Sequence, residues 1–219
     1  MDTKALQEQF NKGEILTFEK PTIILASQSK YRKKMMEDAG VNFIILASDF
    51  DDSDINYDYD HTNVSRKQEA IYSKEMAIAK LQPFIGKIVN GVVVTSDTTV
   101  WCQGRILEKP ITPEKCKEQH EFESGKTTYI YTSIAVHYNG KTESEVLICK
   151  VKIKKLPSEV IEKICQEEGS LNCAGFHSAG AIKPYVKFAK GAGNIVAGFH
   201  VPTMNKLLKR VGFPVESKS

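Results

Sequence analysis

The stretch Thr22–Arg32 reads Thr-Ile-Ile-Leu-Ala-Ser-Gln-Ser-Lys-Tyr-Arg. Its apolar part, residues 23–26, is short and β-branched, which predicts a buried strand. Residues 30–39 are typical of a helix, with Ser29 as the N-cap and Gly40 just beyond the end. A helix that begins directly after a buried strand presents free backbone N–H groups and the positive end of its dipole. This arrangement predicts an anion site.

Hydroxyl and cationic side chains gather at the same turn, namely Ser27, Ser29, Lys30 and Arg32. Their donors add to those of the backbone, so we expect a phosphate group to bind there. The competing interpretation is an ordinary strand-turn-helix with a serine cap, because such turns are common.

Composition narrows the class of protein. At 219 residues, 41% hydrophobic and 26% charged, the chain can form one large globular domain or two small lobes. A net charge of +3 is too small to indicate nucleic acid binding. The five cysteines form no Cys-x-x-Cys pair, which predicts reduced thiols rather than disulfides or a zinc site. We find no signal peptide pattern and no stretch that approaches a membrane span, so we expect a cytoplasmic protein.

The first twenty residues are predicted to be an extension of the main domain. Residues 2–12 can form a short amphipathic helix, and the first core strand is expected at 22–26. The apolar run at 42–47 predicts a second strand. We therefore divide the chain into an N-terminal extension at 1–20 and a single domain at 21–213.

Residues 49–60 contain six aspartates. They do not fit an EF-hand loop, which needs Gly at its sixth position and Glu at its twelfth, where this chain has Asp54 and Asp60. Most of these residues are expected in a solvated acidic loop. Asp51 and Asp52 lie nearest the preceding strand. They are placed to meet a Mg²⁺ ion, which prefers one or two carboxylates plus substrate phosphates.

Residues 64–82 form a predicted helix whose inner face carries Ala70, Ile71, Ala77, Ile78 and Leu81. Lys74 falls on this same face, three residues after Ile71 and three before Ala77. Its ammonium group either reaches solvent, which is the usual outcome, or points into a cleft. In the second case Lys74 is a candidate for a functional role.

Asp97 is the strongest catalytic candidate from the residues alone. Residues 91–101 begin with a triple valine, typical of a central buried strand, and then run into Asp97. A buried Asp is costly unless it is paired, hydrogen-bonded or bound to metal, and ligands of α/β sheets favour the carboxyl ends of strands. The competing interpretation is a turn-forming Asp. Further along, Lys109 precedes Pro110, which holds it extended and can aim its side chain.

The second half of the chain predicts a long antiparallel ribbon. Residues 127–137 and 142–153 alternate polar and apolar side chains on either side of Asn139-Gly140, a strong hairpin signal. Helices are expected at 113–122, 157–167 and 201–211.

Five short motifs follow one another along the chain: Leu25-Ala26-Ser27-Gln28-Ser29, Asp97-Thr98, Leu107-Glu108-Lys109-Pro110, Ser124-Gly125-Lys126 and Ala174-Gly175. They are similar to the Leu-Ala-Ser-x-Ser, Asp-Thr, Leu-Gly-Lys-Pro, Ser-Gly-Lys/Arg and Lys-Ala-Gly elements of one family. Each motif is weak alone, but their order and spacing are fairly specific. Residues 22 to about 212 therefore resemble the Maf family, nucleoside-triphosphate pyrophosphatases first linked to inhibition of septum formation.

The resemblance implies an elongated α/β fold of the Maf/inosine-triphosphate-pyrophosphatase type. In this fold a mixed, twisted sheet flanked by helices forms two lobes around a central cleft, often in a homodimer. It implies cleavage between the α and β phosphates, assisted by a divalent metal (Mg²⁺, with Mn²⁺ or Co²⁺ as alternatives), to give a nucleoside monophosphate and pyrophosphate. The substrates it implies are pyrimidine triphosphates such as dTTP and UTP, and 7-methyl-GTP in one subgroup. Neither nucleic acid nor a membrane is an implied partner.

The resemblance also implies roles for residues of the first motifs. Ser27 and Arg32 would grip phosphate, and we group Ser29, Lys30 and Thr98 with them as substrate-binding candidates.

Four further residues take roles in catalysis and metal binding by the same resemblance. Asp51 would match the acidic metal ligand of the family. Lys74 and Lys109 would stabilise the triphosphate, and Asp97 would activate the attacking water or hold the metal.

The chain departs from the family pattern at Glu108, where glycine is usual, at Thr128, where the family has histidine, and at three further places. Tyr31 replaces an arginine, Cys173 replaces the lysine of Lys-Ala-Gly, and a functional glutamine falls at Gly180. These departures bear on nucleobase choice and turnover. They motivate an alternative function, a catalytically weak nucleotide-binding regulatory protein.

Overall fold

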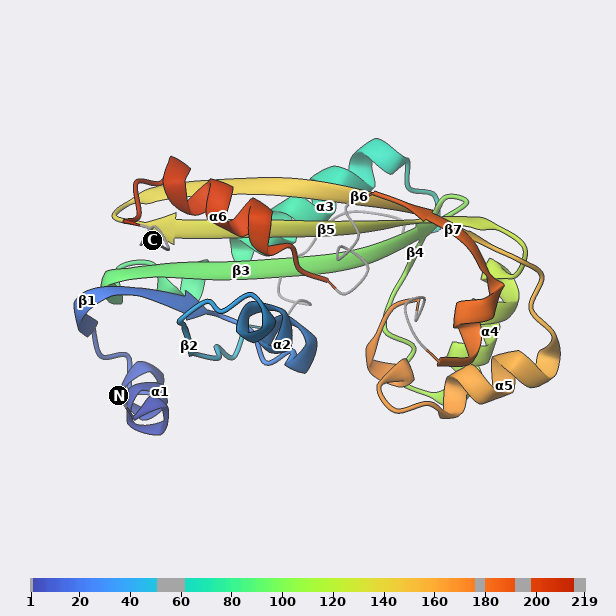
Figure 1. Cartoon of the computed structure of the whole chain (residues 1–219), viewed down its shortest axis with the longest axis horizontal. Coiled ribbons are helices and arrows are strands. Elements are labelled where there is room, and N and C mark those ends of the chain that lie inside the picture. The colour runs from blue at the N-terminus through green and yellow to red at the C-terminus, as the bar shows by residue number, and fades with distance from the viewer. Residues whose placement is uncertain (1, 51–61, 176–179, 192–197, 215–219) are drawn as a thin grey trace.

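The computed structural model describes residues 2–50, 62–175, 180–191 and 198–214. Its strands are β1 (Leu16–Leu25), β2 (Ile44–Ile45), β3 (Ile88–Cys102), β4 (Arg105–Leu107), β5 (Thr127–Tyr138), β6 (Lys141–Ile153) and β7 (Val186–Lys190). They form one seven-stranded sheet with the order β2-β1-β3-β5-β6-β7, and β4 pairs with β3 outside this path (Figure 1). β1 pairs in parallel with β2 and β3, whereas the other pairings are antiparallel. The mixed sheet that we expected is therefore present.

The α-helices are α1 (Thr3–Asn11), α2 (Lys30–Asp38), α3 (Arg66–Ala79), α4 (Pro113–Glu123), α5 (Ser158–Gln166) and α6 (Val201–Arg210). Short 3₁₀ turns are η2 (Gln82–Phe84), η3 (Ser170–Asn172) and η4 (Gly180–Tyr185). The helices predicted around 30–39, 64–82, 113–122, 157–167 and 201–211 are confirmed to within a few residues. No helix of the described ranges is long and apolar enough to span a membrane.

The long strand β3 connects the two ends of the molecule. Its pairing with β1 ends where Leu25 meets Val94, and its pairing with β4 begins where Val100 meets Leu107. Among the described strands, none pairs with this edge of β3 over residues 95–99. The sheet is therefore open at the place where Asp97 was predicted to act.

Helices cover both faces of the sheet, with α6 in front and α3 behind in Figure 1. The alternation of side chains along β3 sends Val92 and Val94 into the core that includes Met204 of α6. Val93 points the other way, into a core that includes Ala77 of α3.

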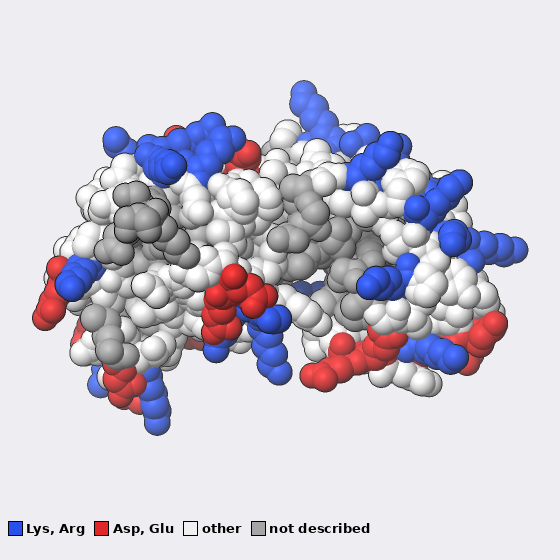
Figure 2. Space-filling model, viewed as in Figure 1, with Lys and Arg blue, Asp and Glu red and all other residues white. Residues whose placement is uncertain are grey.

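A second lobe is built at the far end of β3, β5 and β6. There α4, α5 and the turns η3 and η4 surround a separate core whose buried residues include Cys102, Ile153, Ile161 and Ile182 (Figure 1). In the space-filling view a notch separates the two lobes at the lower edge of the molecule (Figure 2). The predicted fold class, an α/β fold with two lobes, is confirmed.

The first strand is longer than the sequence predicts. β1 begins at Leu16, six residues before the predicted start at Thr22, and its register against β3 shifts between Thr17 and Thr22. Pro21 lies in this interval and has no N–H to donate, which explains why an interrupted strand looked like a strand start. The division of the chain at residue 20 stays a prediction.

The N-terminal helix packs on the main sheet. Phe10 of α1 is 5% exposed and stacks on Phe84 with ring centroids 4.6 Å apart. The helix predicted at 2–12 is therefore present, and its apolar side contributes to the core beneath α3.

The hairpin predicted from Asn139-Gly140 is also confirmed. Tyr138 and Lys141 pair at the end of the β5–β6 ribbon. The two turn residues have φ angles of 47° and 76°, and both positive values fit a two-residue turn that matches the twist of the flanking strands.

Candidate active site

The turn after β1 is held together by its own side chains. Ser29 caps α2, since its Oγ accepts a hydrogen bond from the backbone N–H of Arg32 at 3.4 Å. The Oγ of Ser27 accepts from the N–H of Ser29 and from Nη1 of Arg32, both at 3.2 Å. Hydroxyl, guanidinium and helix N-terminus thus lie together, as the sequence predicted, whereas Lys30 is exposed on the first turn.

A backbone carbonyl from the C-terminal part of the chain joins this turn to β3. The oxygen of Gly198 accepts from Nε of Arg32 at 3.1 Å and from Oγ of Ser96 at 3.0 Å. Gly198 has a φ of +81°, and a Cβ built there would lie 2.9 Å from Oγ1 of Thr98. A glycine is therefore needed for this close approach. The predicted residues Arg32 and Thr98 lie side by side around it.

A cavity of about 170 Å³ opens beside the turn, and Ser27, Gln28, Arg32 and Lys80 are among its lining residues. Two cations and a hydroxyl in one small cavity suit an anionic group. This cavity is the part of the described molecule that best fits a phosphate.

Lys80 connects the cavity to Asp97. Its Nζ lies 2.6 Å from Oδ1 of Asp97, with 19% of the lysine side chain and 9% of the aspartate side chain exposed. The buried aspartate is thus paired, as its cost of burial requires. Its second oxygen, Oδ2, is buried without a hydrogen-bond partner in the described part of the chain.

The structure corrects the predicted orientation of α3. Lys74 is exposed, and so is Ile71 at 42%, whereas Glu69, Ser73 and Met76 are buried. The prediction that Lys74 shares the inner face is wrong because polar residues occupy two of the buried positions. Of the predicted apolar face, Ala77 and Leu81 are buried and Ile71 is exposed, so the apolar residues alone identified only part of the inner face.

Serines hold the helix in this orientation. The Oγ atoms of Ser73 on α3 and Ser133 on β5 are 2.8 Å apart and share a hydrogen bond. Lys80 follows Ser73 by seven residues, which is two turns, and this spacing is the signal that could have found it.

Glu69 is a buried carboxylate that the sequence reasoning missed. It is 0% exposed, and the Thr99 hydroxyl is the hydrogen-bond partner of its carboxyl group. Burial raises the pKa of Glu69 from 4.5 to about 7; the neighbouring Thr99 hydroxyl lowers this pKa and the charge of Asp97 raises it further. Both neighbours lie on β3, so Glu69 belongs to the same group as Asp97.

A family model described as Maf-like protein matches residues 22–211. This chain belongs to the Maf-like family.

Several named relatives cover most of this Maf-like chain. The 7-methyl-GTP pyrophosphatase of Nitrosococcus oceani is 28% identical over 89% of this chain and 96% of the relative. That of Idiomarina loihiensis is 32% identical over 72% and 78%. The dTTP/UTP pyrophosphatase of Acholeplasma laidlawii is 28% identical over 71% and 78%. A solved structure, a HAM1 protein from Coxiella burnetii, aligns with 85% of this chain and 90% of its own at a TM-score of 0.35 and 11% identity.

Two residues where this Maf-like chain departs from the motifs lie beside residues of the site. Burial raises the pKa of the Cys173 thiol, and the nearby positive charges of Lys109 and Arg32 partly oppose this rise. Lys109 and Arg32, far apart in sequence, thus both lie near Cys173. Tyr31 is 50% exposed, and a Cβ built at Gly169 would lie 3.4 Å from its hydroxyl. Tyr31 of α2 therefore reaches the second lobe.

Gly180 has a different environment. It adopts a φ of +62°, and a Cβ built there would overlap the Glu167 carboxylate, which accepts a hydrogen bond from the N–H of Ala181 at 2.6 Å. A glutamine cannot occupy this position without displacing Glu167.

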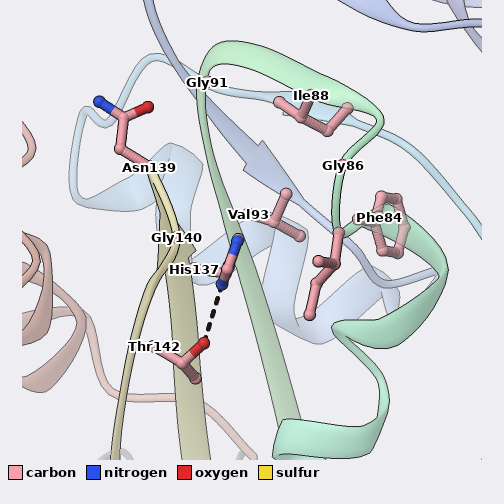
Figure 3. Close-up of a pocket in the computed structure, with 10 residues that line it drawn as sticks. Phe84, Gly86, Ile88, Gly91, Val93, His137, Asn139, Gly140 and Thr142 are labelled. Atoms are coloured by element: carbon pink, nitrogen blue, oxygen red, sulfur yellow. Dashed lines mark hydrogen bonds between the residues drawn. The ribbon is translucent and has the colours of Figure 1, made fainter.

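A larger cavity of about 540 Å³ lies at the opposite end of β3, near the tip of the β5–β6 hairpin (Figure 3). It has an apolar side formed by Phe84 and Val93, facing His137, whose Nδ1 is 2.8 Å from Oγ1 of Thr142. None of its described lining residues is Lys, Arg, Asp or Glu. It therefore does not suit a triphosphate.

Proposed function

We propose that this protein is a nucleoside-triphosphate pyrophosphatase, which hydrolyses the bond between the α and β phosphates. The observation that carries the proposal is the Lys80–Asp97 pair, which adjoins the anion cavity of Ser27 and Arg32 at the open edge of β3. The names of the relatives support it, since they include 7-methyl-GTP, dTTP/UTP and nucleoside triphosphate pyrophosphatases. A pyrimidine or modified nucleoside triphosphate is accordingly the proposed substrate.

The proposed substrate binds through its phosphates. The N-terminus of α2 and the side chains of Ser27 and Arg32 bind one phosphate group, while Lys80 and Lys109 stabilise negative charge on the others. Lys74 has no part in this arrangement, because it is exposed on the outer side of α3.

A divalent metal fits the oxygen donors around Asp97. No group of three or more His, Cys, Asp or Glu residues within the described ranges could hold an ion alone. Mg²⁺ needs no such group, because it uses one or two carboxylates together with substrate phosphates. The buried Oδ2 of Asp97 is a free donor of this kind. Asp51 lies outside the described residues, and its role as a second ligand stays a prediction.

The proposed reaction joins a water oxygen to the α phosphorus and breaks the bond to the bridging oxygen, so that pyrophosphate leaves. A bound metal ion would neutralise phosphate charge and lower the pKa of a water molecule. Asp97 would hold the metal ion from β3. Lys80 and Arg32 stabilise the charge that develops on the leaving pyrophosphate.

The test is pyrophosphate release from dTTP, UTP, CTP, 7-methyl-GTP, GTP and ATP with Mg²⁺, Mn²⁺ or Co²⁺. We expect a metal-dependent rate on one class of base. Asp97→Ala should lose at least about 100-fold in kcat while its circular dichroism spectrum is retained. An undiminished rate in Asp97→Ala would refute the assignment.

The alternative is a nucleotide-binding regulatory protein with weak catalysis. Tyr31 and Gly180 favour it, since each stands where the family has a functional side chain. Triphosphate binding without pyrophosphate release in folded protein would support this alternative. The homodimer and the cytoplasmic location remain predictions.

A further inference from the structure

Glu69 has no role in the function proposed above. We propose that Glu69 is a second carboxylate ligand of the divalent metal, which it holds together with Asp97. The inference rests on the proposed function only for the identity of the site as metal-dependent.

Contacts on both sides of Glu69 fix its position over the sheet. Three residues earlier, Nε of Arg66 donates to the hydroxyl of Tyr131 at 3.3 Å. Four residues later, Ser73 shares its hydrogen bond with Ser133 at 2.8 Å. Both partners belong to β5, so this part of α3 lies along that strand.

The register of the sheet then places Glu69 over β3. Tyr131 pairs with Thr99, and Ser133 pairs with Asp97. Directly paired residues share a face of the sheet, so Asp97 and Thr99 point toward α3. On α3, Glu69 lies between the two residues that contact Tyr131 and Ser133, so it lies over the β3 residues paired with them. The charge of Asp97 accordingly acts on the Glu69 carboxyl group.

Oδ2 of Asp97 is buried without a hydrogen-bond partner in the described chain, and the two buried oxygens of Glu69 have only the Thr99 hydroxyl as a partner there. Such groups each cost free energy when they are left without partners. Their clustering is unusual, since buried polar atoms are mostly satisfied. Carboxylate and hydroxyl oxygens are ligands that suit a hard divalent cation, which would satisfy several of them together.

The alternative is a protonated glutamic acid with a purely structural role. A structural carboxyl group is expected to donate its proton to an acceptor and to accept from a donor. An apolar side chain of similar length would pack in the same place without the cost of burying a carboxyl group. The two roles differ in what happens to metal binding when the carboxylate is replaced.

The experiment measures Mn²⁺ binding to the nucleotide-free full chain from the electron paramagnetic resonance signal of free Mn²⁺. We expect Glu69→Gln and Glu69→Met each to raise the Kd for Mn²⁺ by at least about tenfold. The control is Glu75→Gln, which removes an exposed carboxylate from the same helix and should leave the Kd unchanged. A Kd in Glu69→Gln equal to that of the unmodified chain would overturn the inference.

Thermal denaturation with and without Mn²⁺ distinguishes a structural role of Glu69 from a role in metal binding. Without metal, both Glu69 variants should have a Tm equal to or above that of the unmodified chain, and Mn²⁺ should raise their Tm less. A lower Tm in both variants without metal, with the Mn²⁺ response retained, would overturn the inference.

Pyrophosphate release from the unmodified chain is recorded in parallel. Release in the unmodified chain with normal Mn²⁺ binding in Glu69→Gln would refute the role of Glu69 and leave the proposed function intact. Weakened Mn²⁺ binding in Glu69→Gln without release by the unmodified chain would refute the proposed function and leave the metal site intact.

Discussion

Lys74 and Lys80 lie on α3 and at its C-terminal end, and their side chains have different environments. Lys80 is mostly buried against Asp97, whereas Lys74 is exposed. We expect Lys80→Met to lower kcat/KM by about 100-fold, because it removes a cation from the phosphate cavity and leaves a buried carboxylate unpaired. Lys74→Met should change kcat/KM by less than about twofold. Steady-state pyrophosphate release measures both, and the reverse order of effects would contradict the assignment.

A second prediction for a single residue concerns Glu69, whose buried carboxyl group should make the free energy of unfolding depend on pH. Its pKa is about 7 in the folded chain and 4.5 in the unfolded chain. Between these pH values the unfolded chain loses the proton while the folded chain keeps it, so the free energy of unfolding falls as pH rises. The fall is about 3 kcal/mol and ends near pH 7.

Urea unfolding in EDTA from pH 4.5 to pH 8 measures this change. Glu69→Gln should remove the corresponding slope, so its stability relative to the unmodified chain should grow with pH. Parallel pH profiles for the two proteins would show that the Glu69 carboxyl group is not perturbed.

The candidate site could be predicted from sequence where a local pattern determines the neighbours. Ser27, Ser29 and Arg32 share one turn, so the strand and cap signals were enough to bring them together. Glu69 could not be found this way, and Lys80 could be found only from its seven-residue spacing to Ser73 once the buried position of Ser73 was known. The phase of α3 depends on polar contacts with β5, a strand about sixty residues further along the chain.

The β5–β6 hairpin offers a prediction at the level of secondary-structure elements. Gly140 has a φ of +76°, and a Cβ built there would meet nothing within 4 Å. Gly140→Ala should therefore destabilise the protein by about 1 kcal/mol through backbone strain alone. Asn139→Gly, at the other positive φ, should change the free energy of unfolding by less than about 0.5 kcal/mol. Urea unfolding at constant m-value compares the two, and an equal loss in both would contradict the turn geometry.

The boundaries of helices and strands were predicted best where the sequence itself contains a turn or capping residue. The hairpin and the start of α2 have such signals in Asn139-Gly140 and Ser29. The start of β1 was missed because Pro21 interrupts its register with β3, which made residues before it look like an extension.

At the scale of the whole molecule, substrate binding should stabilise the fold. The site takes its residues from the β1–α2 turn, from α3 and its C-terminal end, from β3, from the loop after β4 and from the segment before α6. A non-hydrolysable α,β-methylene dUTP at about 100 times its Kd should stabilise the folded state by about 2.7 kcal/mol. For a chain of this length that is a rise in Tm of about 5–10 °C.

The same measurement on Asp97→Ala with Mg²⁺ should show a smaller rise, since part of the metal site is lost. If neither protein shows a rise with any analogue of the proposed substrates, the described cavity is not a triphosphate site.

The most direct test of the central claim is to identify the reaction products by ³¹P nuclear magnetic resonance, using the preferred triphosphate and Mg²⁺. The account predicts nucleoside monophosphate and pyrophosphate in equal amounts from the unmodified chain and neither from Asp97→Ala. Nucleoside diphosphate with inorganic phosphate, or the same products at the same rate from Asp97→Ala, would contradict it.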